Sequence, residues 1–243
     1  RRLTRPLVLH RRKQQVLDLP PKQRMFEGID LDAEELKGFD YRLRLVIDDY
    51  RQRVAQGLVR SDAESLAVLT ALRQIAAEFK LPAAQQLIQR LREQHKPIVL
   101  FSSFVDPLLL LHERLGGVLL TGRQKPEQRQ FAVDRFQAGE TDLLLATFAA
   151  GGLGFTLHRA QHVVLLERPW TPGDIDQAED RCHRIGMEGG LISHWLQLGL
   201  ADQLVDGLVA SKAERIELLL GPRRVALDRQ PLPKLVSRCL QDL

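Results

Sequence analysis

The sequence lacks the motifs by which an enzyme holds a nucleoside triphosphate unaided. Across all 243 residues there is no G-x-x-x-x-G-K-[ST] loop and no D-E-x-H carboxylate pair. The loop would cradle phosphates with its backbone N–H groups and lysine, and the carboxylates would hold magnesium. We therefore expect the chain to bind ATP weakly and, by itself, to hydrolyse none.

Cysteines and long apolar runs are also scarce. Cys182 and Cys239 are the only cysteines, which excludes a disulfide scaffold, and the seven histidines show no metal-binding spacing. No apolar run approaches the roughly 20 residues that cross a bilayer, and no signal peptide precedes the sequence. We therefore expect no metal site, no membrane partner and a cytoplasmic location, nucleoid-associated in a bacterium or nuclear in a eukaryote.

The amino-acid composition is that of a globular domain, and its charged residues are unevenly distributed along the chain. Hydrophobic residues make up 44% of the chain and charged residues 27%, which is typical of a packed soluble domain. The first 24 residues contain one acid, Asp18, and eight bases: Arg1, Arg2, Arg5, Arg11, Arg12, Lys13, Lys22 and Arg24. Such a local excess attracts phosphate backbones, although a solvated linker can have the same composition.

Strand and helix patterns alternate from residue 97 onward. Apolar runs predict buried strands at 98–101, 118–121, 143–146, 162–166 and 191–198, and amphipathic spacing predicts helices at 105–115, 126–137 and 202–220. This alternation favours an α/β fold with a parallel sheet covered by helices on both faces. Ligands of such sheets collect at the carboxyl ends of the strands.

The preceding residues follow a helical pattern after one expected strand at 25–30. Apolar residues spaced by three and four predict a helical protrusion from 31 to 79, which Lys80-Leu81-Pro82 interrupts before a second amphipathic helix. We divide the chain into a basic segment with the first strand (1–30), the protrusion with connecting helices (31–94), the α/β lobe (95–220) and a tail (221–243).

The centre of the functional prediction is a helix expected after the break Pro169-Trp170-Thr171-Pro172. Offsets of 0, 4 and 7 place Gln177, Arg181 and Arg184 on one stripe of that helix. Ala178, Cys182 and Ile185 repeat these offsets and predict an apolar stripe that docks on the sheet. Two guanidinium forks beside each other suit phosphate oxygens, although a solvated basic face is the alternative.

Several segments in the same order resemble the helicase-like ATPases of superfamily two that are related to the SWI/SNF chromatin remodellers. QAEDRCHRIG resembles their motif VI, and LLLATFAAGGLGFTLHRAQHVVLLERPWTP resembles their motif V. PIVLFSSFVDPLLLLHERL is similar to motif IV, LLTGRQKPEQRQFAVDRFQ to the block that follows it, and RRKQQVLDLPPKQR to the segment that leads into their second RecA-like lobe. The residues of motifs V and VI are most similar to those of the annealing-helicase subgroup. Thr156, Glu167, Thr171 and Met187 depart from the family pattern.

The resemblance implies a RecA-like fold and the second motor lobe of an ATP-dependent double-stranded DNA translocase. It implies that ATP and Mg2+ are held mainly by a first RecA-like lobe, to which this lobe supplies Arg181, Arg184 and Gln177. The positions implied for nucleotide binding are Gly152, Gly154 and Glu167, and those for DNA binding are Ser102, Thr121, Arg129, Thr147 and Trp170. Each of the smaller DNA candidates could instead be a helix cap or surface group, and Trp170 could be a core residue.

Two other functions are compatible with the same sequence. A RecA-like lobe can be retained as a DNA or protein docking module in a motor that no longer hydrolyses ATP, which the two intact arginines disfavour. A strand-separating helicase is the second alternative. The lack of an initiating methionine suggests a piece cut at a lobe boundary, so we expect the missing nucleotide motifs in the residues before Arg1.

Overall fold

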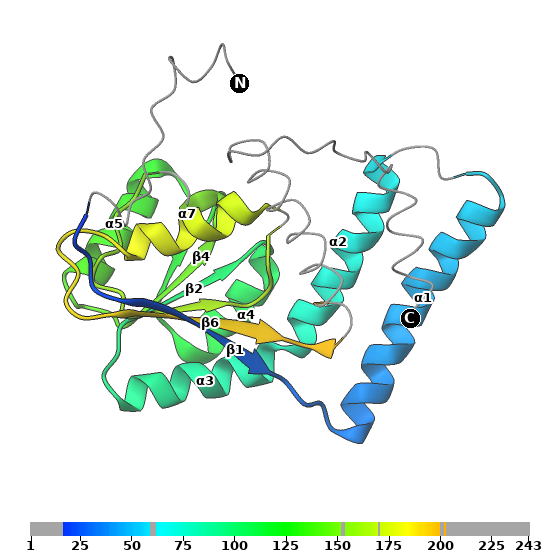
Figure 1. Ribbon diagram of the computed structural model, residues 1–243, viewed down its shortest axis with the longest axis horizontal. Coiled ribbons are helices and arrows are strands. Elements are labelled where there is room, and N and C mark those ends of the chain that lie inside the picture. Colours follow the sequence, from blue (N-terminus) through cyan, green and yellow to red (C-terminus); the bar gives the residue numbers. More distant parts are fainter. Residues whose placement is uncertain (1–16, 59–61, 152–153, 170, 200–201, 203–243) are drawn as a thin grey trace, which may run out of the picture.

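The computed structural model describes residues 17–58, 62–151, 154–169, 171–199 and 202 (Figure 1). Its centre is one six-stranded sheet in the order β1-β6-β5-β2-β4-β3, in which every pairing is parallel. The strands are β1 Lys22–Gly28, β2 Ile98–Ser102, β3 Val118–Leu120, β4 Leu143–Thr147, β5 His162–Leu165 and β6 Leu191–Gln197. The predicted α/β class with a parallel sheet is confirmed.

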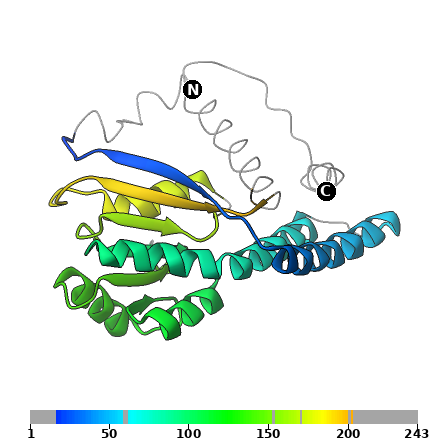
Figure 2. The same cartoon turned by 90° about the horizontal axis from the view of Figure 1, so that it is seen from below.

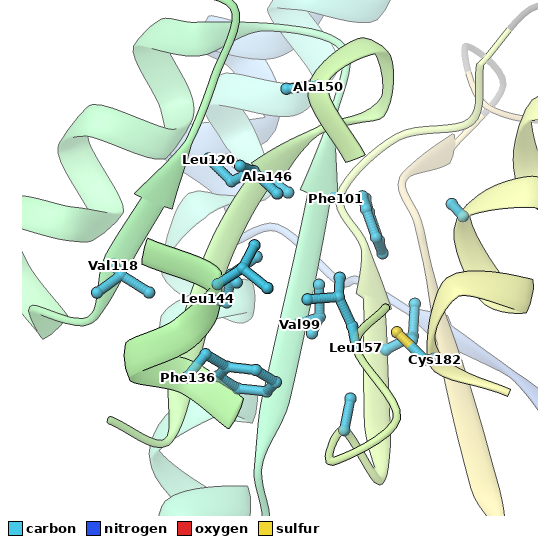
Figure 3. Packing of buried hydrophobic residues seen from close by; sticks show 14 of the residues in the cluster. Val99, Phe101, Val118, Leu120, Phe136, Leu144, Ala146, Ala150, Leu157 and Cys182 are labelled. Carbon is cyan, nitrogen blue, oxygen red and sulfur yellow. The ribbon is translucent and has the colours of Figure 1, made fainter. Parts of the chain in front are cut away.

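The central strands are apolar on both sides because helices cover both faces of the sheet. Ile98 and Leu100 of β2 contact the helices α3 Leu81–Glu93 and α4 Val105–Leu115. Val99 and Phe101, which alternate with them, face α5 Pro126–Gln137 and α7 Pro172–Cys182. Figure 3 shows this second layer, with Phe136 of α5 and Cys182 of α7 directed towards the strands.

The predicted protrusion is a pair of helices, α1 Ala33–Ala55 and α2 Asp62–Phe79, that extends beyond the sheet (Figure 2). Asp32 begins α1 with a capping box to Glu35, and Gly57, at φ 68°, follows its end, so the predicted continuous helix is interrupted. The two helices bury a core of their own around Phe39, Tyr50 and Leu72. Among the described helices, none is long and apolar enough to span a membrane.

The helix α3, which we grouped with the protrusion as a connecting helix, packs on the sheet. Leu81, Leu87 and Leu91 share a buried cluster with strand residues of β2 and β4. The helices that cover the sheet therefore begin with α3, the protrusion ends with α2, and β1 joins the same sheet from before the protrusion. Pro82 lies in the first turn of α3, where its missing N–H has no helical partner to lose.

A single helical turn, α6 Phe148–Gly151, separates β4 from the glycine-rich loop and was not predicted. Gly151 lies against the ring of Phe101, and a Cβ at this position would come within 2.6 Å of that ring. A glycine is therefore required here by the close approach of the turn to β2.

Substitution of Gly151 by alanine should destabilise the fold by about 1–3 kcal/mol, the range expected for overpacking a core. Chemical denaturation of the 243-residue chain measures the change. Gly173→Ala is the matched control, because nothing lies within 4 Å of a Cβ at that helical position. Equal midpoints for Gly151→Ala and wild type would contradict the packing argument.

Three polar side chains from the neighbouring strands β5, β6 and β1 form a hydrogen-bonded chain. Nδ1 of His162 lies 2.9 Å from Nε2 of His194, whose Nδ1 lies 2.8 Å from Oε1 of Glu27. A carboxylate only accepts, so His194 donates to Glu27 through Nδ1 and accepts from His162 through Nε2. Burial, with smaller electrostatic contributions from His194 and Lys96, lowers the pKa of His162 to about 4.

This low pKa makes the free energy of unfolding depend on pH. Between its unfolded value near 6.5 and its folded value of about 4, His162 binds a proton only in the unfolded chain, so stability falls as the pH falls through this window. The slope from this one group is at most about 1.4 kcal/mol per pH unit. Urea unfolding of wild type and His162→Asn at several pH values should show a shallower fall in the variant; identical slopes would contradict the assignment.

Candidate functional site

The helix α7 ends earlier than the sequence pattern predicts. It stops at Cys182, because His183 has φ −81° and ψ 81° and is turned so that its Nε2 lies 2.7 Å from the carbonyl oxygen of Pro20. Ala178 and Cys182 are buried on the sheet as expected, but Ile185 is 71% exposed. The prediction that Arg184 and Ile185 continue the stripes of the helix is therefore wrong.

Arg184 lies after the end of α7, but its side chain contacts the last turn of that helix. Its Nε donates to the carbonyl oxygen of Asp180 at 3.1 Å, and its Nη1 donates to Oγ1 of Thr156 at 3.1 Å. Burial lowers the pKa of Arg181, and the positive charge of Arg184 lowers it further while Asp180 opposes the change. The two guanidinium groups are thus electrostatic neighbours, one from the helix and one from the turn after it. Gln177 is exposed one turn before Arg181.

The position of α7 on the sheet depends on Glu179, whose side chain is fully buried. Its carboxylate accepts from Nζ of Lys22 at 2.9 Å, from Nη2 of Arg24 at 2.6 Å and from Nε1 of Trp195 at 3.3 Å. Burial alone would raise the pKa of Glu179, but the bonds from Arg24 and Lys22 hold it below its usual value. The neighbouring strands β1 and β6 therefore contribute to one buried charge cluster with this helix.

Lys22 and Arg24 belong to the basic segment that we expected to attract phosphate. In the structure both are engaged with α7, since Arg24 also pairs with Asp176 and Lys22 lies 3.9 Å from Asp180. Their role as phosphate ligands is not supported by these contacts. The other six bases, Arg1, Arg2, Arg5, Arg11, Arg12 and Lys13, lie outside the described residues.

Removing the two cations should be more harmful than neutralising the carboxylate. Lys22→Met with Arg24→Met leaves a buried carboxylate without compensation, which we expect to cost about 3 kcal/mol or more. Glu179→Gln leaves two partly exposed cations that water can reach, so about 1–2 kcal/mol is expected. Denaturant unfolding of both variants tests the order.

The control for this comparison is an exposed ion pair of the same length. Arg42 and Glu78 lie 2.6 Å apart with side chains 42% and 39% exposed, so Arg42→Met should cost less than about 1 kcal/mol. A loss as large as that of the double variant would show that the burial of Glu179 is not the cause.

Ser102 and Glu167 meet in a second buried cluster. Oγ of Ser102 lies 3.1 Å from Oε2 of Glu167, and the backbone N–H of Ser103 donates to the same carboxylate. Nη2 of Arg73, from α2, donates to Oγ of Ser103 at 2.7 Å and lies 4.0 Å from Oε1 of Glu167. Burial raises the pKa of Glu167, against the nearby charge of Arg73. Neither Ser102 nor Glu167 is presented to solvent, so their predicted contacts with DNA and nucleotide would require these bonds to open.

Sequence reasoning missed the buried lysine that joins the protrusion to the sheet. Lys80 is fully buried between α2 and α3, where its Nζ donates to the carbonyl oxygens of Leu166 at 3.0 Å and Leu196 at 3.2 Å. Asp202 lies 2.5 Å from the same nitrogen. Burial lowers the pKa of Lys80, and Asp202 opposes this shift. A lysine beside a leucine and a proline carries no sequence signal of such a partner.

The remaining predicted contacts follow the carboxyl edge of the sheet. Ser102 and Thr147 are register partners at the ends of β2 and β4, and Thr121 follows β3 beside them. Thr121 and Thr147 are 3% and 5% exposed. Oγ1 of Thr147 accepts from the N–H of Ala150 at 3.3 Å, which is the capping role that we considered as its alternative.

Arg129 and Gly154 lie at more open positions. Arg129 lines a groove on α5 with the exposed Phe131 and the partly buried Phe155. Gly154 has φ 91°, a conformation that favours glycine. Gly152 and Trp170 lie outside the described residues, and their predicted roles stay predictions.

Known proteins are similar to this chain in sequence or in fold. Residues 80–186 match the family model described as "Helicase conserved C-terminal domain". YwqA of Bacillus subtilis (strain 168), described as an ATP-dependent helicase/translocase, is 27% identical over 237 residues, covering 86% of this chain and 25% of that protein. The human DNA annealing helicase and endonuclease ZRANB3 is 26% identical over 233 residues, covering 92% and 21%.

Among solved structures, the C-terminal part of the Fun30 ATPase domain has a TM-score of 0.68 at 16% identity and covers 93% of this chain and 98% of that one. The chain is similar in sequence to helicases and in fold to the C-terminal lobe of SNF2-like ATPases. The Sulfolobus solfataricus SWI2/SNF2 ATPase core in complex with dsDNA has the same fold, with a TM-score of 0.64 at 22% identity over 89% of this lobe and 50% of that chain.

The chain spans about a fifth to a quarter of the length of the curated relatives that it matches. The bacterial and the annealing-helicase relatives are similar to it at nearly equal identity, so identity does not separate these subgroups.

Proposed function

We propose that this chain is the second motor lobe of an ATP-dependent double-stranded DNA translocase and supplies arginine fingers to a nucleotide held by a preceding lobe. The observation that carries the proposal is the pair of neighbouring guanidinium groups, Arg181 and Arg184, at the end of α7. The names of the relatives support the reaction class, since one is named as an ATP-dependent helicase/translocase and the other as a DNA annealing helicase.

The two arginines suit an ATP molecule bound with Mg2+ across a lobe interface. Arg184 adds to the lowering of the pKa of Arg181, so the two positive charges repel each other and an anion close to both would relieve the repulsion. ATP, when bound, supplies the phosphoanhydride bond whose hydrolysis drives the motor. With no phosphate loop in the sequence, this lobe by itself would hydrolyse none.

In this arrangement the lobe contributes charge stabilisation only when it closes on its partner. Arg181 and Arg184 would lie against the oxygens of the transferring phosphoryl group, and Gln177, on the same face of α7 as Arg181, would help to orient them. Because a separate lobe delivers the arginines, ATP hydrolysis depends on closure of the two lobes. As the lobes close and open, each would in turn grip and release the DNA.

The hold on DNA would come from the carboxyl edge of the sheet. Arg129, with its partly exposed side chain, is the candidate for direct contact with a phosphate. Thr121, Thr147 and Ser102 are buried, so we propose that they position loops whose backbone amides face the duplex. The SWI2/SNF2 core of the same fold has been solved with dsDNA, which is consistent with a duplex as the partner.

Loss of either arginine should abolish most of the ATPase activity of the full-length protein. Arg181→Ala and Arg184→Ala should each lower turnover at saturating DNA by about 10³-fold, the scale associated with an arginine finger. DNA affinity, measured by fluorescence anisotropy, should change little, since neither residue is assigned to the duplex.

The matched control is Arg90→Ala, which removes an exposed arginine from α3 on the opposite face of the sheet. It should leave turnover unchanged. Turnover within about threefold of wild type for both α7 variants would contradict the finger assignment. A full-length wild type without DNA-stimulated hydrolysis would favour the docking-module alternative.

A further inference from the structure

The loop after the glycine-rich turn contacts both arginines of the proposed finger pair. The backbone N–H of Leu157 donates to the carbonyl oxygen of Arg181 at 2.8 Å, and Oγ1 of Thr156 accepts from Nη1 of Arg184 at 3.1 Å. The side chain of Leu157 is fully buried in the cluster that also holds Cys182 of α7 (Figure 3). The loop is therefore anchored in the core at the residue next to Thr156.

Two bonds on one guanidinium define its orientation. Nε of Arg184 is held by the carbonyl oxygen of Asp180, and Nη1 is held by Thr156. A guanidinium is planar and has five N–H groups, so two fixed donors set its plane and the direction of the other N–H groups. Without the Thr156 hydroxyl, only the bond at Nε is retained, and the plane can turn about that bond.

We propose that Thr156 is a positioning residue for Arg184, whose hydroxyl holds the guanidinium in the plane from which it reaches a nucleotide. This inference rests on the proposed function, because it assumes that Arg184 acts as a finger. Thr156 lies two residues after Gly154, so the hydroxyl also links the glycine-rich turn to the nucleotide side of the lobe.

The position of the Arg184 guanidinium matters because an arginine finger stabilises charge only when it is correctly placed against the phosphoryl group. A displacement of about 1 Å in a catalytic group can lower a rate by as much as 10²-fold. The Thr156 hydroxyl does not touch the nucleotide in this proposal, so its removal should change the rate of the chemical step and leave the affinity for ATP nearly unchanged. A residue that only stabilises the fold would change neither constant per folded molecule.

The test compares Thr156→Val, which keeps the shape but loses the acceptor, with Thr156→Ser, which keeps the acceptor, in the full-length protein. DNA-stimulated ATPase assays give kcat and KM for ATP, and thermal melting gives the folded fraction. Thr156→Val should lower kcat by about tenfold to a hundredfold with KM within about threefold of wild type. Thr156→Ser should keep kcat within about threefold of wild type.

A double-mutant cycle shows whether the hydroxyl acts through Arg184. Once Arg184 is alanine, Thr156→Val should have no further effect on kcat, because the hydroxyl has no guanidinium to hold. Losses that multiply in the double variant would overturn the inference. A Thr156→Val enzyme with normal kcat, or a Thr156→Ser enzyme as slow as Thr156→Val, would also overturn it.

Two further outcomes distinguish failure of the proposed arginine finger from failure of the Thr156 inference. Normal turnover of Arg184→Ala would overturn the proposed finger and this inference with it, whereas a slow Arg184→Ala beside a normal Thr156→Val would overturn the inference alone. If Thr156→Val does not fold, Thr156→Ala replaces it in the same cycle, with the same expected loss of kcat and the same contrary outcome.

Discussion

A buried carboxylate holds the arginine helix on the sheet. Glu179 accepts bonds from β1 and β6, the two strands at one side of the sheet, and its helix presents Arg181 two residues later. Because an isolated carboxylate in this position would be strongly disfavoured, the helix cannot leave these strands without exposing or protonating Glu179. The direction in which Arg181 points is thus set by a charge cluster that lies on the other side of the helix.

The same cluster connects the arginines to the start of the chain. Lys22 and Arg24 lie in β1, directly after the segment that leads into the lobe. His183, at the end of α7, bonds the carbonyl oxygen of Pro20 in that segment. If a preceding lobe is joined here, its connection contacts the chain at Glu179 and His183, shortly before Arg184. Movement of the connection would then act on the arginine pair without passing through the rest of the sheet.

The elements predictable from the sequence were those that local pattern decides. β2 and β4 are apolar runs bounded by proline or polar residues, and α4 and α5 have the expected bounds because glycines follow them. The end of α7 was not predictable, since Ile185 fits the apolar stripe and the helix is stopped by a tertiary bond from His183. From the sequence, Lys22 and Arg24 resemble phosphate ligands. Their actual partner, Glu179, is more than 150 residues away, and no local sequence pattern predicts that pairing.

Buried charged groups attach the protrusion to the sheet. Only Lys80 separates α2 from α3, and its ammonium group is bonded to the ends of β5 and β6 while Asp202 pairs with it. Arg73 joins α2 to Glu167 at the same edge. Bending at this joint would separate buried opposite charges, which is strongly unfavourable. These buried bonds connect the protrusion to the sheet beside Glu167 and Ser102, at the carboxyl edge where the DNA-binding residues are predicted, and they oppose bending at that joint.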